Sequence, residues 1–430
     1  MTGPAGSWAR LAVVSTLALS LAVIPPTAVV AQERVATEPL SLAEALSRSA
    51  ASDPAQAGAQ ARARAGEASV RQADVRPNPT LGLMVENFPA FGGGDILGRT
   101  ETTLSYEQRI ERGGDRPARV SLARSEGALV AATARVRRLD RLEQVQRAWA
   151  EALAAEAEVA IARERLDLAE QFQAEVRRRV DMARDPLFAG ARAEAELAQA
   201  QIDFDQAEIA ARIAKISLAK FWEGPANFSL GETAFEDTSA ARVIIDGIAQ
   251  ADLDIFVAQR DIARAQVAVE QARRTQDATV SVGVRHFWEG QDLGLVVGGS
   301  IPLGRYDQNT GAIDRARAEG LAAEGDLSAA RTERERETAR LQVQLSARAS
   351  EARRIGEETL PQAERAVRLV REGFNRGGFT YNDVISAQTA LLQTRDRRVK
   401  VLKQFHIDRA RLDRLTGAHG DLIVASETQP

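Results

Sequence analysis

Cysteine is absent from the 430-residue chain, and aromatic residues make up only 5% of it. The lack of cysteine excludes a disulfide framework and a lipid anchor attached to an N-terminal cysteine. So few aromatic residues, beside 44% hydrophobic and 27% charged residues, are atypical of a compact enzyme. Abundant alanine, arginine, glutamate and glutamine instead indicate long helices.

Histidine and methionine are also scarce, with three of each. His286, His406 and His419 fall on a predicted strand end, a helix and the tail, without the spacing of metal ligands. The sequence also contains no P-loop, GxSxG or HExxH pattern. We therefore expect no catalytic, cofactor-binding or metal site, and we interpret the three histidines as surface or packing residues.

Charge is nearly absent from residues 1–31, where Arg10 is the only charged residue. The apolar run LAVVSTLALSLAVI is short for a bilayer span, and small residues precede Gln32, so we expect a cleaved signal peptide over residues 1–31. No later apolar run is long enough for a transmembrane helix. Removing Arg10 leaves 55 of the 56 basic residues against 60 acidic residues, a charge of about −5 that gives no indication of a nucleic-acid partner.

Helical and strand-like sequence patterns alternate along the rest of the chain, and the same order of patterns occurs twice. In the first repeat, residues 32–222, helical sequence surrounds a strand-like segment at about 78–110. In the second repeat, residues 246–417, it surrounds a strand-like segment at about 278–303. A linker rich in Gly, Pro and Asp, residues 223–245, separates the repeats, and residues 418–430 form a flexible tail. This order predicts an internal duplication.

Each strand-like segment is predicted to form a β-hairpin. Apolar and polar residues alternate in four rows of about ten residues, the length that a tilted strand needs to cross a bilayer. Phe88, Phe91, Phe287 and Trp288 gather beside the hairpin loops, where an aromatic girdle at the membrane surface would lie. The alternative interpretation is a pair of hairpins packed on one face against a soluble core.

The helical segments are longer than those of an ordinary globular domain. After Pro117 no proline occurs up to Val180, and an unbroken helix there would be on the order of 95 Å long at about 1.5 Å per residue. A second run from Gly311 toward Phe374 is similar, with a kink expected at Pro361. Apolar residues at coiled-coil spacing form the predicted core stripes, which include Val136, Leu139, Leu142, Val145, Trp149 and Leu153, then Ile385, Leu392 and Val399.

Four strands of membrane length cannot close a barrel on their own. Their unpaired edges would expose backbone groups to lipid at several kcal/mol each. Several copies of the chain must therefore share one barrel, and three copies would supply twelve strands. The predicted fold class is an α+β membrane protein with a long α-helical coiled-coil tunnel and four transmembrane β-strands in each chain.

The signal sequence, the two repeats with two strands each and the long coiled coils together resemble the TolC-type outer-membrane efflux proteins. The segments PNPTLGLMVENF, LGLVVGGSIPL, YNDVISAQTALL and RLDRLTG are most similar to the CzcC-like branch, which serves heavy-metal pumps of the resistance-nodulation-division class. The resemblance implies a homotrimer whose β-barrel lies in outer-membrane lipid and whose tunnel extends into the periplasm. It also implies two partners, a periplasmic adaptor (membrane fusion protein) and an inner-membrane resistance-nodulation-division pump, with no cofactor.

Two breaks in the long helices are predicted to be the turns of helical hairpins. Glycine or proline ends one helix in each break, and a polar residue can cap the next. In TolC-like proteins such tips form the periplasmic mouth and dock the adaptor, so the resemblance implies adaptor contacts here. The implied docking residues are Arg184, Asp185, Pro186, Leu187, Gly377, Gly378 and Thr380.

The resemblance also implies a periplasmic gate just after the second turn. Asp383 occupies the position of the family's first gate aspartate, whereas Ser386 stands in place of a second acid and Phe379 in place of an arginine that links the coils. One hypothesis is that Asp383 of three subunits forms an acidic ring, with Phe379 as an apolar plug or docking contact. The other is that Asp383 is only a favourable charge at a helix N-terminus.

The resulting functional prediction is the outer-membrane channel of a tripartite efflux system that passively conducts divalent heavy-metal cations. A channel for drugs or for type I protein secretion is the alternative within the same class. A periplasmic coiled-coil adaptor and a structural envelope protein without a conduit are alternatives from other classes. The paired hairpins of membrane length argue against the adaptor.

Overall fold

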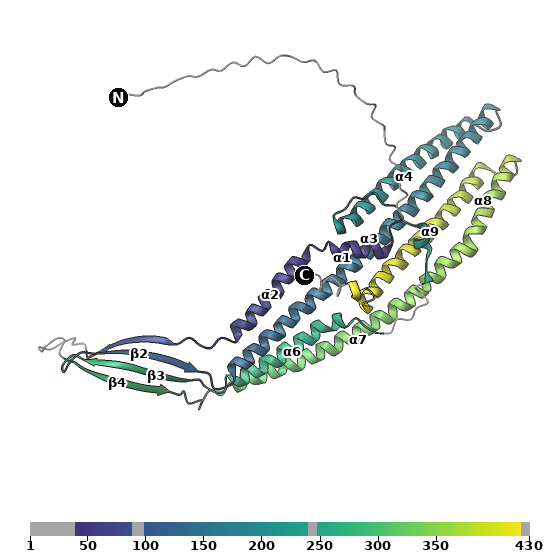
Figure 1. Cartoon of the computed structure of the whole chain (residues 1–430). Coiled ribbons are helices and arrows are strands. Elements are labelled where there is room, and N and C mark those ends of the chain that lie inside the picture. Colours follow the sequence, from purple (N-terminus) through teal and green to yellow (C-terminus); the bar gives the residue numbers. More distant parts are fainter. Residues whose placement is uncertain (1–38, 88–98, 240–246, 423–430) are drawn as a thin grey trace, which may run out of the picture. The chain divides into compact units, whose positions relative to one another are not determined.

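The computed structural model describes residues 39–87, 99–239 and 247–422 (Figure 1). The predicted signal peptide, residues 1–31, and the girdle residues Phe88 and Phe91 lie outside the described residues. The described part is mainly helical, with one β-sheet. Its α-helices are α1 (Leu42–Ala51), α2 (Ala55–Ala73), α3 (Asp115–Asp181), α4 (Leu187–Ala219), α5 (Glu232–Glu236), α6 (Gln250–Ala272), α7 (Thr310–Arg354), α8 (Leu360–Asn375) and α9 (Tyr381–Thr416).

The longest helix, α3, confirms the unbroken run predicted after Pro117. It has 67 residues, which at about 1.5 Å per residue is on the order of 100 Å. Asp115 lies in its first turn, and Arg178 and Arg179 lie in its last turn, so its end charges favour the helix dipole. Because α3 packs against α2, α6, α4 and α9, it connects every layer of helices in the described chain.

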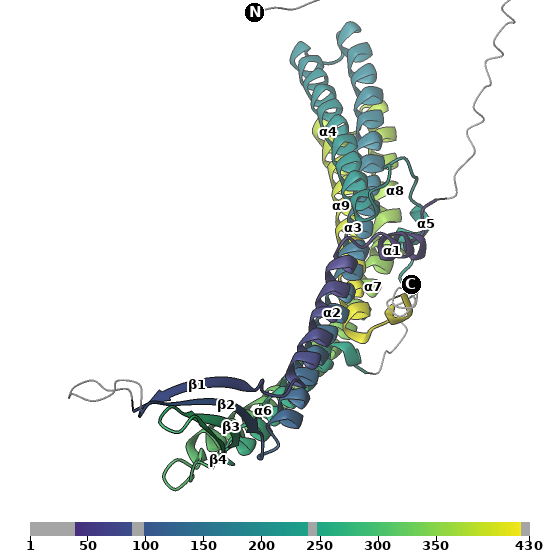
Figure 2. The same cartoon turned by 60° about the vertical axis from the view of Figure 1, so that its left-hand side comes forward.

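The main hydrophobic core surrounds the middle of α3, where α1, α5 and α9 pack against it (Figure 2). The stripe predicted from coiled-coil spacing faces this core. Leu139, Leu142, Val145, Trp149 and Leu153 are all at most 5% exposed, which confirms them as core residues. Phe235 of α5 belongs to this core, and α5 contacts α9 as well as α3.

The second long run is not a single α-helix. A π-helical segment, Ile355–Thr359, joins the end of α7 at Arg354 to the start of α8 at Leu360. Pro361 has no backbone N–H to donate to the carbonyl four residues earlier, so an ordinary α-turn there would leave that carbonyl unpaired. The wider π-turn accommodates this loss. The kink predicted at Pro361 therefore takes the form of a π-turn immediately before it.

The sheet contains β1 (Thr80–Glu86), β2 (Glu101–Ile110), β3 (Ala278–Phe287) and β4 (Asp292–Ser300) in sequence order, and all neighbours are antiparallel. Each predicted hairpin is present, and β2 pairs with β3 to join them. The fourth strand ends at Ser300, so Ile301 and Leu303 of the predicted row lie beyond it. Within the described residues, β1 and β4 each keep one edge without a strand partner.

The elements on either side of the sheet occur in the same order in both halves, a helix before the hairpin and a long helix after it (Figure 1). Thus α2 and α3 flank the first hairpin, and α6 and α7 flank the second. These four helices pack side by side in the order α2, α3, α6, α7. The strands to which they connect lie in the same order in the sheet. This order agrees with an internal duplication, which stays a prediction.

Candidate functional site

One face of the sheet is mainly aliphatic, with Thr102, Gln108 and His286 as its polar members. The strand register aligns Leu83, Leu104, Val284 and Leu295 in one row across all four strands. These side chains point away from the rest of the chain, and Leu295 is 74% exposed. Water would penalise such a surface, whereas lipid would not, so the face is suited to a bilayer. The other members of this face are Leu81, Val85, Tyr106, Val280, Val282, Leu293 and Val297.

The opposite face of the same strands is polar. The alternation of side chains along each strand places four carboxylates and two guanidiniums on this face, which leaves two net negative charges per chain. The remaining positions are mostly glycine, serine and threonine, together with Met84, Val296 and Phe287. The charged members are Glu86, Glu101, Glu107, Asp292, Arg109 and Arg285.

The two described residues of the predicted aromatic girdle lie on different faces. Phe287 is on the polar face, because a side chain on its neighbour Gly294 would meet the Phe287 ring within 3.0 Å. Trp288 donates from Nε1 to the Thr102 hydroxyl at 3.3 Å and packs edge-on against His286, both on the aliphatic face. Phe287 and Trp288 therefore point to opposite sides of the sheet, and the girdle role of both residues stays a prediction.

The turn between α3 and α4 contains Arg184, Asp185 and Pro186. Asp185 accepts two hydrogen bonds from the Arg179 guanidinium, at 2.8 and 3.1 Å, so its carboxylate is fixed within the turn. Leu187, the first residue of α4, is 83% exposed. Such a large exposed aliphatic side chain at a tip is available to a partner.

The turn between α8 and α9 contains two glycines, of which Gly377 has a backbone conformation that favours glycine. Gly377 has φ of 82°, a left-handed conformation that favours glycine, and Gly378 donates its N–H to the Gly373 carbonyl at 2.8 Å. The Phe379 ring folds back over Gly373, where any side chain would clash with it, and remains 46% exposed. Gly373 belongs to no turn or capping pattern in the sequence, and only its packing against Phe379 identifies it.

Asp383 forms a capping box with Thr380 at the start of α9. Its carboxylate accepts from the Thr380 N–H at 2.8 Å and from the Thr380 hydroxyl at 2.7 Å, while the Asp383 N–H donates to that hydroxyl at 3.3 Å. These bonds from Thr380 lower the pKa of Asp383. The carboxylate thus has a local structural role in this chain, and its participation in an acidic ring with Ser386 nearby stays a prediction.

Side chains that the sequence did not single out connect the two helical hairpins at their tips. Tyr381 donates from its hydroxyl to Glu196 Oε2 at 3.0 Å, and Arg192 donates to the Asn382 side-chain oxygen at 3.0 Å. Arg179 also donates to the Phe374 carbonyl at 3.1 Å. Beneath these links lies a small apolar cluster made of Phe172, Val176, Ala189, Ala193, Phe374 and Val384.

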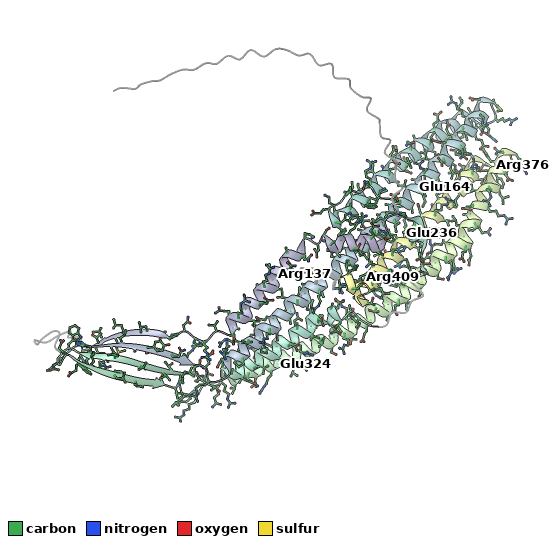
Figure 3. All side chains as sticks on the ribbon, in the orientation of Figure 1. Arg137, Glu164, Glu236, Glu324, Arg376 and Arg409 are labelled. Atoms are coloured by element: carbon green, nitrogen blue, oxygen red, sulfur yellow. The ribbon has the colours of Figure 1, made fainter. Side chains whose placement is uncertain are left out.

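The tip links differ from the arginine link that the resemblance implies at position 379, where this chain has Phe379. The arginines here belong to α3 and α4, and their acceptors on the second hairpin are a carbonyl and a neutral amide. Burial, followed by the bond to Glu196, raises the pKa of Tyr381. The phenol therefore stays protonated and able to donate. Figure 3 shows Arg376 at this same end of the helices.

A second polar cluster lies between α3, α6, α7 and α9. Arg414 is 6% exposed and donates to Asp140 at 2.8 Å and to the buried Asp252. Arg411 joins it through Glu337, at 3.0 Å, and Glu143. Each buried charge has a partner, so the cluster fixes the relative positions of four helices that are distant in sequence.

The three histidines lie in separate places, on β3, on α9 and just after α9. His406 lies 2.8 Å from the Phe235 carbonyl through Nε2 and stacks on the Phe235 ring, and burial lowers its pKa. Within residues 39–87, 99–239 and 247–422, no three His, Cys, Asp or Glu side chains are grouped as metal ligands. Over the same ranges, no helix has both the length and the hydropathy needed to cross a membrane.

Comparison with known proteins gives a consistent family. The model of the family described as Outer membrane efflux protein matches residues 248–418. The chain is 30% identical over 419 residues to the cobalt-zinc-cadmium resistance protein CzcC of Cupriavidus metallidurans, covering 93% of this chain and 98% of that protein. It is 28% identical to the nickel-cobalt-cadmium resistance protein NccC of Alcaligenes xylosoxydans xylosoxydans, covering 75% of this chain and 71% of that protein.

Solved structures share the fold at low sequence identity. The outer membrane protein VceC from Vibrio cholerae is 20% identical, with a TM-score of 0.67 over 87% of this chain and 96% of that chain. CusC is 15% identical, with a TM-score of 0.69 over 86% of this chain and 91% of that chain. Together with the aliphatic face of the sheet and the match to CzcC, these likenesses show that the chain belongs to the outer membrane efflux proteins, in the CzcC-like branch, and that it is an outer-membrane protein extending into the periplasm.

Proposed function

We propose that the chain is the outer-membrane channel of a tripartite efflux system and that its substrates are divalent heavy-metal cations. The observation that carries this proposal is the two-faced sheet, in which an aliphatic face backs a polar face with two unpaired edges. In a bilayer such edges must be paired. Three copies pair β1 of each chain with β4 of the next, and twelve strands close around the polar face.

The helices support the same assembly. None of the residues of α2 is buried, although its Gly66 packs closely against Gly127 of α3. On α4, an apolar row is 45–59% exposed, although this helix packs against α3 and, near its tip, contacts α9. We assign both surfaces to contacts with neighbouring copies. The exposed row consists of Ile202, Ile209, Ile213 and Ile216.

Two features support cations as the substrate. The polar face of the sheet has two net negative charges per chain, so a closed trimer would present about six to its lumen and would favour cations over anions. The names of the relatives CzcC and NccC specify resistance to cobalt, zinc, cadmium and nickel. The same charge disfavours acidic drugs and polypeptides.

The exposed side chains at the tips of the helical hairpins indicate the kind of partner. Leu187 and Phe379 are exposed beside the two turns, and the neighbouring Phe188 is 71% exposed. Apolar side chains at the end of a helical hairpin suit a coiled-coil partner, which we propose is the periplasmic adaptor of a proton-driven inner-membrane pump. In this assembly the channel is passive, and Asp383, Ser386 and Phe379 lie at its periplasmic mouth.

A planar bilayer experiment tests the channel, and a deletion strain tests its substrate. Purified detergent-solubilised protein is expected to cross-link as a trimer and to give discrete cation-selective conductance. The deletion strain is expected to become sensitive to zinc, cobalt, cadmium or nickel, and sensitivity to none of them would contradict the assignment of metals. A protein released with the soluble periplasm would contradict the channel itself.

A further inference from the structure

Arg285 occupies the centre of an ion-pair cluster on the polar face of the sheet. Its guanidinium lies 2.8 Å from Glu86 Oε2 and donates to Glu101 Oε2 at 2.7 Å and to the Thr103 hydroxyl at 2.9 Å. Glu86 is on β1, Glu101 and Thr103 are on β2, and Arg285 is on β3. One side chain from the second hairpin therefore binds two carboxylates of the first hairpin.

The cluster lies at one end of the sheet. Glu86 is the last residue of β1, Glu101 is the first of β2, and Arg285 is two residues before the end of β3. The helices α3 and α7 begin at the other end of the strands. In a channel whose helices extend into the periplasm, the cluster lies near the outer opening of the barrel.

The charges of the cluster do not cancel. Two carboxylates share one guanidinium, so one negative charge per chain remains. The second oxygen of Glu101 accepts from the Asn87 side chain at 3.2 Å, which holds this carboxylate in place. Three copies of the cluster would contribute six carboxylates and three guanidiniums to one opening, in addition to the Asp292 carboxylate at the start of β4 in each copy. Without the guanidiniums, the same ring would be a cluster of six unpaired carboxylates.

A channel conducts cations only when its sites bind them weakly enough to release them. We propose that Arg285 is a specificity-determining residue of the outer opening. The fixed positive charge of its guanidinium lowers the affinity of the Glu86 and Glu101 carboxylates for multivalent cations. This inference rests on the proposed channel function. It adds that a basic residue, beside the acidic ones, sets how readily divalent ions leave.

The competing explanation is that Arg285 only fastens the two hairpins together. The two explanations differ for lysine, which keeps the positive charge but loses the planar fork that reaches three acceptors. Arg285→Lys should therefore preserve selectivity if charge is the function, although it weakens the cluster. Arg285→Gln removes the charge and should alter selectivity.

The experiment uses the full-length protein in planar bilayers, with hexaamminecobalt(III) added on the outer side as an impermeant multivalent cation. We expect Arg285→Gln to lower the half-blocking concentration by about tenfold or more, because the loss of one unit charge about 6 Å from a trivalent cation in water corresponds to about 30-fold before screening by salt. Arg285→Lys should stay within about twofold of the wild type. The double variant Arg285→Gln with Glu86→Gln should return close to the wild-type value, because it restores the net charge.

Arg109→Gln is the matched control. It removes a guanidinium from the same face, but Arg109 pairs with Thr279, six positions along β3 from Arg285. That separation is about 20 Å at about 3.3 Å per residue, beyond the screening length of about 8 Å at physiological salt. Block from the outer side should therefore not change.

The outcomes separate the two proposals. If the wild-type protein forms no conducting channel, the proposed function fails. If it conducts and Arg285→Gln leaves the half-blocking concentration unchanged, the role of Arg285 in selectivity is wrong. Equal loss of thermal stability in the Gln and Lys variants, without any change in block, would also overturn it and leave Arg285 as a fastener of the two hairpins.

Discussion

Replacing Tyr381 by Phe tests whether the tip links hold the two helical hairpins together. The hydroxyl donates to Glu196 Oε2 at 3.0 Å and is the only atom removed. The ring keeps its packing on Phe172, at 5.0 Å between centroids, and its position beneath the Arg192 guanidinium, at 4.9 Å. Any effect of Tyr381→Phe is therefore due to the hydrogen bond and not to the loss of packing.

The size of the effect follows from the environment of the bond. A hydrogen bond to a charged acceptor contributes about 1.5–3 kcal/mol, and the partial exposure of both groups reduces this to about 1 kcal/mol. If separation of the hairpins opens the mouth in three subunits together, the loss is about 3 kcal/mol per channel. This corresponds to an increase of about 150-fold in the ratio of open to closed channels.

The fraction of time that single channels conduct in a planar bilayer measures this ratio. Tyr306→Phe is the matched control, because Tyr306 also loses only a hydroxyl but is 91% exposed and lies far along the chain from both tips. A conducting fraction for Tyr381→Phe that equals the wild-type value would refute the reasoning. So would an equal increase in Tyr306→Phe.

The pH dependence of this link has a definite sign. Burial and Glu196 raise the pKa of Tyr381, so the protonated phenol is favoured in the folded chain. A raised pKa contributes stability that is complete below the unfolded value of about 10 and is lost only as the pH rises toward and through the folded value. The hydroxyl should therefore donate to Glu196 equally well from about pH 6 to about pH 9.

Three further predictions concern stability. Leu295→Arg places a charge on the aliphatic face and should cost about 2–4 kcal/mol, seen as a lower folding yield into lipid. Arg414→Met leaves the buried Asp252 with only the more distant Arg334 guanidinium, at 3.6 Å, and should cost about 3 kcal/mol, whereas the double variant with Asp252→Leu should recover most of it in thermal unfolding. His406 has a lowered pKa, so stability should fall as the pH drops below its unfolded value of about 6.5, and His406→Phe should remove this dependence.

Each stability prediction has its own control. For Leu295→Arg it is Ser105→Arg on the polar face, and an equal loss of folding yield would contradict the assignment of faces. For Arg414, additive losses in the double variant would show that it does not pair with Asp252. For His406, thermal unfolding at about pH 8 and about pH 5.5 should differ in the wild type only, and equal differences in both proteins would assign the effect to another group.

Local patterns gave the elements of this fold. The run after Pro117 and the alternation along β1 to β4 are periodic in sequence, and periodicity determines both the type of an element and the face it buries. The same alternation places Leu83, Leu104 and Val284 on one face of the sheet, as the strand register shows. It places Phe287 on the opposite face, because Phe287 is an odd number of positions from Val284.

The functional contacts could not be read in the same way. Arg285 and Glu101 are 184 residues apart, and Tyr381 and Glu196 are 185 residues apart. No spacing rule connects such residues, since their proximity depends on the register of strands and on the way the hairpins pack. The strands themselves could be predicted, whereas the partner of each charged side chain could not.

The π-turn at Ile355–Thr359 has a consequence for the geometry of the whole second hairpin. Its extra residue shifts the helical phase by about 100°, so side chains after it point in a different direction from those before it. Before the turn, Leu341 and Leu345 bury against Phe405 and Leu412; after it, Phe374 buries in the tip cluster. The continuous helical run from α7 to α8 therefore packs into two clusters on differently oriented faces. Deleting one residue of the π-turn would rotate the tip residues of α8 by about 100° relative to α7. Deleting seven residues from α8 would shorten the helix by about two turns and nearly preserve the direction of its side chains.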